Sequence, residues 1–375
     1  MLQRQYLNIK PLGKIMAKDK SEVSKLFEEN RKIIDKAIEK FIPKEITLEA
    51  FSNLYGKPKY KIDLEAIQEA VNKPIWNMLE RGGKRWRAVL FLLVYEALGG
   101  KKEDGLDFAI IPEVIHNGTL IVDDIEDGSD LRRGKPAIHK LFGEDITINA
   151  GNIMYYLPLT ALLKNKGKFD DKILSKVYKI YVEEMIDVSM GQALDIAWHR
   201  GLANANNVSE EEFLQMCLYK TGSLARMSAK MAATLVGSDD KTIETLGEMA
   251  GNIGVAFQIQ DDILNLISVE FQKKKGFGED ITEGKRSLLV IHTMKEATDA
   301  DRKRLLEILN SHTKDRKLIE EAIEIIKKNG SVEYSKSIAK KIIKDSWTEV
   351  DKLLPESDAK DKLKKITEFL VEREV

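Results

Sequence analysis

The chain has 375 residues, of which 43% are hydrophobic and 32% are charged. This apolar content is enough for a large buried core and excludes a disordered chain. With 60 basic and 61 acidic residues the net charge is -1, so no overall basic excess points to nucleic acid or to an anionic membrane surface as a partner.

The single cysteine, Cys217, excludes a disulfide framework and a cysteine-rich zinc site within one chain. It suits a reducing compartment, and we expect a cytoplasmic protein. No run of about 18 apolar residues predicts a membrane span, and the N-terminus lacks the apolar region of a secretory signal. We expect residues 1–20 to form a flexible tail and residues 21–375 to form one domain.

Periodic apolar residues predict helices along nearly the whole chain. They recur at steps of three and four from Leu26 to Phe41, where Pro43 ends the predicted helix. The window from Val89 to Val94 is apolar on all faces, as in a central helix surrounded by others. No sustained alternation of apolar and polar residues predicts a sheet. The fold class is therefore all-α, a single large helical bundle, with breaks expected near 99–100, 128–136, 164–167, 201–207, 237–240 and 273–284.

The first acidic cluster runs from Asp123 to Asp127 after the apolar stretch 114–122. On a helix, Asp123 and Asp127 lie one turn apart on the same face, where like charges repel. A divalent cation between them reverses the sign of that interaction. Hard oxygen ligands that leave room for water and phosphate oxygens are typical of a magnesium site.

The second cluster, Asp261 and Asp262 with Asn265 one turn later, follows the largely apolar stretch 251–259. Both clusters thus follow helices that are otherwise buried, and we expect them to face each other across a cavity. An alternative is that acidic residues merely end helices in a chain that has 61 of them. Two such clusters favour a functional site over that alternative.

Basic groups that can bind phosphate lie beside both clusters. Arg132 and Arg133 follow the first in a loop bounded by glycines, and Lys275 and Lys285 follow the second. Upstream, the cations of the segment 81–87 precede an apolar helix, whose free N–H groups also favour an anion. Each cation by itself is more often a solvated surface residue. The segment has no Walker spacing, no dinucleotide-binding GxGxxG is present, and the five histidines lack zinc-ligand spacing.

Taken together, these residues resemble the trans-isoprenyl diphosphate synthase family over nearly all of the chain after its N-terminal segment, and most closely the eukaryotic-type geranylgeranyl diphosphate synthases. The matching elements are Gly82-Gly83-Lys84 with Arg87, Asp123-Asp124-x-x-Asp127, Arg132-Arg133-Gly134, Gly191-Gln192 with Asp195, Lys220-Thr221-Gly222, Phe257-Gln258-x-x-Asp261-Asp262 and Asp280-x-x-Glu283-Gly284-Lys285.

The resemblance implies a prenyltransferase of the isoprenoid synthase fold with a central active-site cavity, acting as a homodimer or higher homo-oligomer. It implies Mg²⁺, three ions per site, held by Asp123, Asp127 and Asp261 with Asp124, Asp262 and Asn265 in support. The residues implied to bind the allylic diphosphate are Arg132, Lys220, Thr221, Gln258, Lys275 and Lys285. Those implied to bind isopentenyl diphosphate are Lys84, Arg87, Arg133 and His116. Without the resemblance, His116 would be interpreted as a core histidine. Asp123, Asp127, Arg132, Lys220, Asp261 and Lys285 form the expected catalytic set.

The resemblance also bears on product length. Gly118 and Thr119 lie five and four residues before Asp123, at positions where bulky aromatic residues in the family stop growth of the product at farnesyl. The two small residues here imply that a longer chain can pass. Tyr155, Tyr156 and His139 resemble the deeper floor of the subgroup, and ordinary core packing is the alternative for the two tyrosines. We expect a C20 product, geranylgeranyl diphosphate. Asn265 and Asn152 stand where many relatives carry Asp.

Three alternative functions remain open at this point. A synthase of C25 or longer products would result if the floor rings point aside. A non-catalytic partner subunit would keep the fold without turnover, although both acidic clusters and both arginines are present. A terpene cyclase would share the metal-bound diphosphate, but cyclases generally lack the second set of cations, here Lys84, Arg87 and Arg133.

Overall fold

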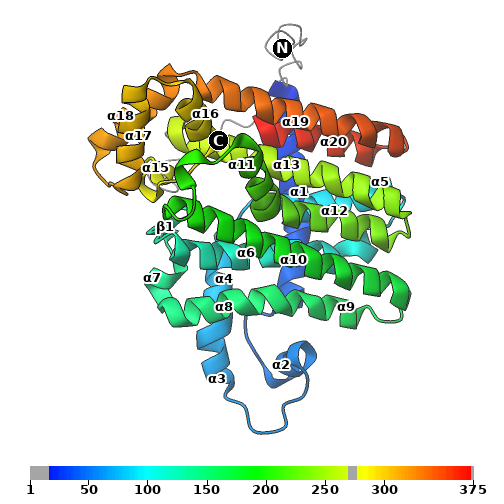
Figure 1. Cartoon of the computed structure of the whole chain (residues 1–375). Coiled ribbons are helices and arrows are strands. Elements are labelled where there is room, and N and C mark those ends of the chain that lie inside the picture. The colour runs from blue at the N-terminus through cyan, green and yellow to red at the C-terminus, as the bar shows by residue number, and fades with distance from the viewer. Residues whose placement is uncertain (1–16, 269–276, 373–375) are drawn as a thin grey trace.

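The computed structural model describes residues 17–268 and 277–372, and helices make up nearly all of this part of the chain (Figure 1). The first half contains α1 (Ala17–Phe41), α2 (Leu48–Tyr55), α3 (Leu64–Ile67), the π-turn η1 (Gln68–Asn72), α4 (Lys73–Leu79), α5 (Trp86–Ala97), α6 (Lys102–Glu126), α7 (Ile138–Phe142), α8 (Glu144–Tyr156), η2 (Leu157–Leu159) and α9 (Thr160–Lys164). The second half contains α10 (Asp171–His199), η3 (Ala205–Asn207), α11 (Glu210–Cys217), the π-turn η4 (Leu218–Gly222), α12 (Ser223–Leu235), α13 (Asp240–Ile267), α15 (Glu279–Glu283), α16 (Leu288–Glu296), α17 (Asp299–Asn310), α18 (Arg316–Lys328), α19 (Ser331–Leu353) and α20 (Asp358–Glu372).

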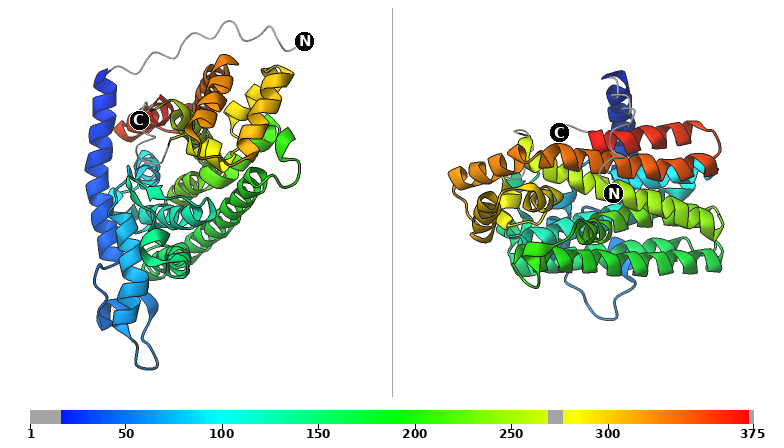
Figure 2. Two further views of the ribbon diagram at one scale, coloured as in Figure 1. Left: turned by 90° about the vertical axis from the view of Figure 1, so that its left-hand side faces the viewer. Right: turned by 45° about the horizontal axis from the view of Figure 1, so that its top comes forward.

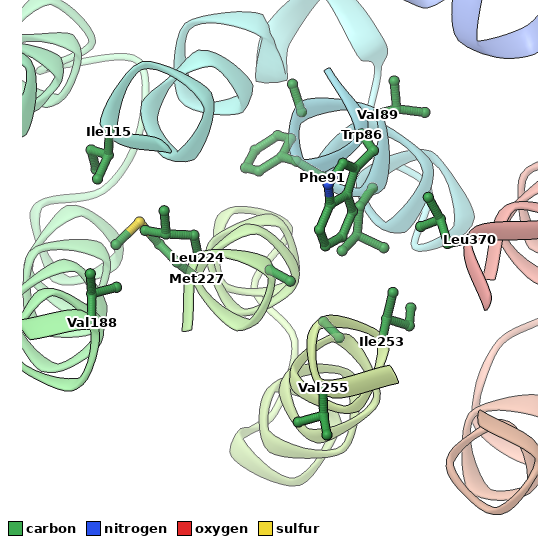
Figure 3. Packing of buried hydrophobic residues seen from close by; sticks show 14 of the residues in the cluster. Trp86, Val89, Phe91, Ile115, Val188, Leu224, Met227, Ile253, Val255 and Leu370 are labelled. Carbon is green, nitrogen blue, oxygen red and sulfur yellow. The ribbon is translucent and has the colours of Figure 1, made fainter. Parts of the chain in front are cut away.

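The core is built around α5, whose residues are all buried except Glu96. This helix packs against α6, α12 and α20, while α13 packs on α12 and on α19. Figure 3 shows apolar side chains from several helices converging there, among them Phe91, Ile115, Leu224 and Ile253. The prediction of a central helix from the all-apolar window is confirmed.

Helix α6 carries the first acidic cluster at its C-terminal end and passes through the body of the bundle. By length and composition it meets the criterion for a membrane-crossing helix, but 67% of its apolar window is buried inside the fold. It contacts α1, α5, α8 and α12, so its apolar faces are covered by other helices. This burial identifies α6 as a core helix.

The helix breaks expected near 99–100, 128–136, 164–167, 201–207 and 237–240 fall at turns and loops between the long helices. The break expected at 273–284 contains α15, and its residues up to 276 lie outside the described residues. The all-α prediction is confirmed. In the described residues the strands are β1 (Leu131–Arg132) and β2 (Lys135–Pro136), which have two residues each and pair as an antiparallel hairpin. Helix α1 begins at Ala17, before the domain start expected at residue 21, and runs along one side of the molecule (Figure 2). Helix α13 continues to Ile267, so the second acidic cluster lies inside its last two turns and not at its end.

Candidate active site

One cavity of about 1240 Å³ brings together most of the predicted site residues. Its charged and polar lining includes Lys84, Arg87, His116, Asp123, Arg132, Arg133, Lys220, Thr221, Gln258, Asp261, Asp262 and Lys285. Part of its apolar lining comes from α10, between Tyr181 and Val188, whereas Gln192 and Asp195 of the same helix lie among the charged groups. Tyr181 and Asp195 are separated by roughly 21 Å at about 1.5 Å per residue. The cavity is therefore polar along one part of α10 and apolar along the other.

Asp123, in the last turn of α6, lies in a dense charge network. Lys220 Nζ lies 3.2 Å from Asp123 Oδ1, and Gln192 Nε2 donates to the same oxygen at 2.9 Å and to Glu126 Oε2 at 2.7 Å. Burial alone would raise the pKa of Asp123, but Lys220, Lys285 and Arg132 together hold that pKa well below its usual range. Asp123 is thus a carboxylate at any physiological pH.

Asp124 has a different position from the one expected for a metal-supporting residue. It is fully buried, it is not among the residues that line the cavity, and its Oδ1 accepts a hydrogen bond from Arg132 Nε at 2.7 Å. Burial opposes the charge of Arg132, but Asp124 and Asp123 outweigh it and raise the arginine pKa. Asp124 thus holds Arg132 in place from behind the cavity wall, and its support of the metal stays a prediction.

Lys220 and Thr221 lie in the π-turn η4. Two glycines allow this turn to pack closely between α10 and α13. A Cβ on Gly191 of α10 would lie 2.2 Å from the backbone nitrogen of Lys220. A Cβ on Gly254 of α13 would lie 2.5 Å from Gly222 Cα. Both approaches are closer than any side chain permits, so glycine is required at each position. The turn is thereby clamped between α10 and α13, with Lys220 also 2.5 Å from Asp195.

The second cluster is linked to the first through this turn. Thr221 Oγ1 donates to Gln258 Oε1 at 2.8 Å, and Gln258 Nε2 donates to Asp262 Oδ1 at 2.8 Å. Burial and the nearby Asp280 raise the pKa of Asp262 to about 8. Asn265, 1% exposed, accepts from the backbone nitrogen of Asp280 at 3.4 Å, so its amide helps to hold α15 against α13.

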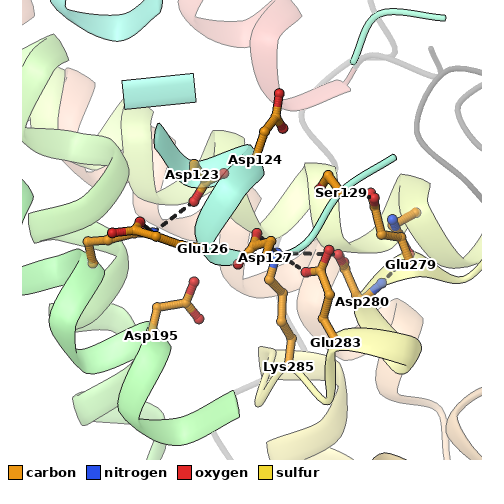
Figure 4. A network of polar contacts seen from close by, with 12 residues as sticks. Asp123, Asp124, Glu126, Asp127, Ser129, Asp195, Glu279, Asp280, Glu283 and Lys285 are labelled. Carbon is orange, nitrogen blue, oxygen red and sulfur yellow. Dashed lines mark hydrogen bonds and ion pairs between the residues drawn. The ribbon is translucent and has the colours of Figure 1, made fainter. Parts of the chain in front are cut away.

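Lys285 closes the network on the side of α15 (Figure 4). Its Nζ lies 3.4 Å from Asp127, 2.5 Å from Glu283 and 3.8 Å from Asp280, which connects α6 to α15. Burial raises the pKa of Glu283 to about 8 although Lys285 opposes the shift. Lys275, the other cation expected here, lies outside the described residues.

A second group of cations lines the cavity between α5, α6 and the β-hairpin. Arg133 Nη1 contacts the carbonyl of Gly82 and lies 3.3 Å from Asn117 Oδ1. Burial lowers the pKa of Arg133 to about 10, with Arg85 adding to the shift, and burial likewise lowers the pKa of Arg87 to about 10 against the effect of Glu113. Burial, together with Arg87 and Arg133, holds the pKa of His116 well below its usual range. A neutral imidazole beside buried arginines is a suitable site for a highly charged anion.

The acidic residues fit a hard divalent cation that a substrate helps to coordinate. Asp127 is not among the residues that line the cavity, but its Oδ1 is buried and has no hydrogen-bond partner among the described residues, as a metal-ligand oxygen would be left without its ion. In the same part of the chain, no group of three His, Cys, Asp or Glu residues lies close enough to hold an ion by itself. An ion here would take few protein oxygens and would complete its shell with water and phosphate, as Mg²⁺ commonly does.

The structure separates the residues predicted to govern product length. Thr119, Tyr155 and Tyr156 line the cavity, whereas Gly118 and His139 do not. A Cβ on Gly118 would lie 2.8 Å from Met154 Cβ, so this glycine permits close packing of α6 on α8. His139 is buried in α7. The expectations that Gly118 opens a path for the chain and that His139 forms its floor are therefore corrected.

Sequence reasoning missed the wall that α10 contributes. Tyr181, Met185 and Ser189 line the cavity, and Tyr181 Oη donates to the backbone carbonyl of Tyr155 at 2.5 Å. Burial raises the pKa of Tyr181 to about 12, so its hydroxyl stays a proton donor. Their spacing along a helix was the available signal, but it does not reveal which buried face borders a cavity.

Comparison with known proteins agrees with this geometry. The family model described as polyprenyl synthetase matches residues 68–326. A short chain isoprenyl diphosphate synthase of Methanothermobacter thermautotrophicus is 36% identical over 298 residues, which cover 80% of this chain and 89% of the relative. A geranylfarnesyl diphosphate synthase of Natronomonas pharaonis is 30% identical over 367 residues, with 94% and 98% covered.

Among solved structures, the geranylgeranyl pyrophosphate synthetase from Pyrococcus horikoshii is similar, with a TM-score of 0.79 and 30% identity. The match covers 95% of this chain and 99% of that one. The family model spans more than half of the chain, and the relatives match it along most of their own length. The chain therefore belongs to the polyprenyl synthetase family and is a prenyl diphosphate synthase.

Proposed function

We propose that the protein condenses an allylic diphosphate with isopentenyl diphosphate to give geranylgeranyl diphosphate (C20) and diphosphate, with Mg²⁺ as its cofactor. The observation that carries this proposal is the single cavity in which two acidic clusters, two groups of cations and an apolar wall meet. The charged part suits two diphosphates, and the apolar part along α10 suits a hydrocarbon chain.

Binding of the allylic diphosphate follows from the charges around Asp123. Asp123, Asp127 and Asp261 would hold the metal ions, three of them on the family pattern, which neutralise charge on the leaving diphosphate. Arg132, Lys220 and Lys285 each lie beside a carboxylate, and all three line the cavity. When the C1–O bond breaks, these fixed cations stabilise the negative charge that develops on the phosphate oxygens.

Isopentenyl diphosphate would occupy the other group of cations. Lys84, Arg87 and Arg133, with His116 as a neutral partner, would bind its diphosphate and direct its double bond at the allylic C1. The new carbon–carbon bond forms between that C1 and C4 of isopentenyl diphosphate, and a proton leaves C2. The apolar walls exclude water from the allylic cation. We assign no side-chain base, because the departing diphosphate can accept the proton.

A C20 product is supported by the tyrosines at the apolar wall. Thr119 is small, so a growing chain can pass it along α6. Tyr155 is partly buried on α8, and the hydrogen bond from Tyr181 to its backbone ties α8 to α10 at this point. Tyr156 is 67% exposed and forms a weaker barrier than Tyr155. We therefore assign the floor mainly to Tyr155 and Tyr181.

The test is a product assay with labelled isopentenyl diphosphate, Mg²⁺ and dimethylallyl, geranyl or farnesyl diphosphate in turn. The extracted prenyl alcohols are separated by chain length, and a C20 product from each primer is expected. Products of C25 or longer would replace the C20 assignment. Folded protein that incorporates nothing would favour the non-catalytic partner subunit, and consumption of geranylgeranyl diphosphate alone would favour a terpene cyclase.

We also infer a homodimer in the cytoplasm. Four apolar side chains that line the cavity are also more than half exposed: Tyr156 at 67%, Val182 at 51%, Ile186 at 57% and Met190 at 55%. The exposed residues of α10 from 182 to 193 are Val182, Glu183, Ile186, Ser189, Met190 and Ala193, of which Glu183 is charged. A second copy packed on this face would cover it. Light scattering after gel filtration should give twice the chain mass of 42.5 kDa, and a monomer would contradict the inference.

A further inference from the structure

Arg87 is held in the cavity wall in an unusual way for a buried cation. It is 4% exposed, lies in the first turn of α5 and lines the cavity. In the described part of the chain no carboxylate lies within ion-pair distance of Arg87, and its Nε has no hydrogen-bond partner. A buried charge normally needs such partners, so some other contact must fix the guanidinium.

That contact is the indole of the preceding residue. The guanidinium carbon of Arg87 lies 4.5 Å from the centre of the Trp86 ring, within the range of a cation–π interaction. Trp86 is itself stacked on Phe257 of α13, with ring centroids 5.2 Å apart and an angle of 29° between the planes. All three side chains line the cavity. Trp86, 5% exposed, is held by Phe257 and can fix Arg87 in turn.

Three other cations of the cavity differ from Arg87, because each has a carboxylate partner. Arg132, Lys220 and Lys285 lie against Asp124, Asp195 and Asp127, whose carboxylates offset their charge. An aromatic ring stabilises a cation through its quadrupole and carries no net charge. Arg87 therefore keeps its full positive charge for an incoming anion while its orientation is fixed.

We propose that Trp86 is a positioning residue that holds Arg87 for the diphosphate of isopentenyl diphosphate and braces it against Phe257. The inference rests on the proposed function, because it assigns Arg87 to that diphosphate. Phe257 directly precedes Gln258, which bonds both Thr221 and Asp262. The stack therefore joins the cation that binds one substrate to the helix that carries the second acidic cluster.

The test uses fluorinated tryptophans incorporated at position 86, because added fluorines weaken the ring quadrupole with little change in shape. Binding of isopentenyl diphosphate is measured by calorimetry without allylic substrate, so the result does not depend on turnover. We expect Kd to rise with each added fluorine, to roughly tenfold for the most fluorinated ring. KM for isopentenyl diphosphate should rise in parallel, while kcat and KM for the allylic substrate stay within about twofold. A role in packing alone would show no such dependence.

Trp76 is the matched control. Lys44 lies 5.0 Å from its ring, so fluorination there weakens a similar contact away from the cavity and should leave Kd unchanged. A second control removes the cation: in an Arg87→Met protein, fluorination at position 86 should add no further loss. Equal Kd across the series in wild-type protein would overturn the inference, as would an undiminished effect in Arg87→Met. Wild-type protein that does not bind isopentenyl diphosphate would instead overturn the proposed function.

Discussion

Replacing Gly191 with alanine tests how the fold places Lys220. The new Cβ would lie 2.2 Å from the backbone nitrogen of Lys220, 2.6 Å from its Cα and 2.7 Å from the Tyr219 carbonyl carbon. Ordinary van der Waals contact begins near 3.4 Å, so α10 and η4 must separate by roughly 1 Å. The obstructing atoms are all backbone, so no side-chain rotation can relieve the contact.

The separation should affect both stability and activity. Over-packing in a well-packed region costs about 1–3 kcal/mol, partly offset by about 1 kcal/mol because alanine favours helix over glycine. A displacement near 1 Å at a catalytic group costs about a hundredfold in rate. We therefore expect Gly191→Ala to be up to about 2 kcal/mol less stable in urea unfolding, with kcat lowered by about a hundredfold.

Gly247→Ala is the matched control on α13. Its Cβ would lie 2.6 Å from Lys230 Cε and 2.8 Å from Lys230 Cγ, so the Lys230 side chain must shift, but no backbone atom obstructs the new methyl group. The variant should keep wild-type kcat. A Gly191→Ala protein with wild-type kcat would refute the clamp of η4, and equal losses in both variants would show a general effect of the substitution.

Three further outcomes follow from the site. Burial raises the pKa of Asp262 in the folded state above its unfolded value, so the native state holds a proton that the unfolded chain has released. In metal-free buffer, the free energy of unfolding of the wild type relative to Asp262→Asn should therefore fall between pH 5 and 8, by up to about 1.4 kcal/mol per pH unit. A difference in chemical denaturation that does not change with pH would contradict this. Tyr155→Ala should lengthen the product, whereas Tyr156→Ala, at a ring that is 67% exposed, should leave it C20. Chromatography of the prenyl alcohols distinguishes these outcomes, and the reverse pattern would assign the floor of the cavity to Tyr156. Asp127→Asn removes the charge of a proposed metal ligand and should raise the Mg²⁺ concentration for half-maximal activity at least about tenfold. An unchanged metal titration would remove Asp127 from the metal site.

The sequence predicted the chemistry of the site better than the orientation of its side chains. Asp123 and Asp127 share a face because four residues make about one helical turn, so their spacing alone brings them together. Neighbouring residues on a helix point about 100° apart. Which of Asp123 and Asp124 faces the cavity therefore depends on how α6 packs, and only the structure reveals that Asp124 holds Arg132.

The fold class was predictable because apolar periodicity reports burial, and α5 with its all-apolar surface lies in the core as expected. Periodicity does not tell whether a buried face meets another helix or a cavity. For that reason Gly118 was assigned to the cavity although it packs on α8, and the wall formed by Tyr181 and Met185 was missed. The glycines that let the π-turn of Lys220 pack closely lie on two other helices, so the sequence of the turn alone does not indicate that packing.

The most direct test of the account is a single-turnover experiment with farnesyl diphosphate and labelled isopentenyl diphosphate. Folded protein is mixed with both substrates, once with Mg²⁺ and once with EDTA. We predict one labelled C20 diphosphate per active site with Mg²⁺ and none with EDTA, since the carboxylates of Asp123 and Asp261 line the same cavity as the cations. Equal incorporation under both conditions, or none in either, would contradict a metal-dependent condensation in this cavity.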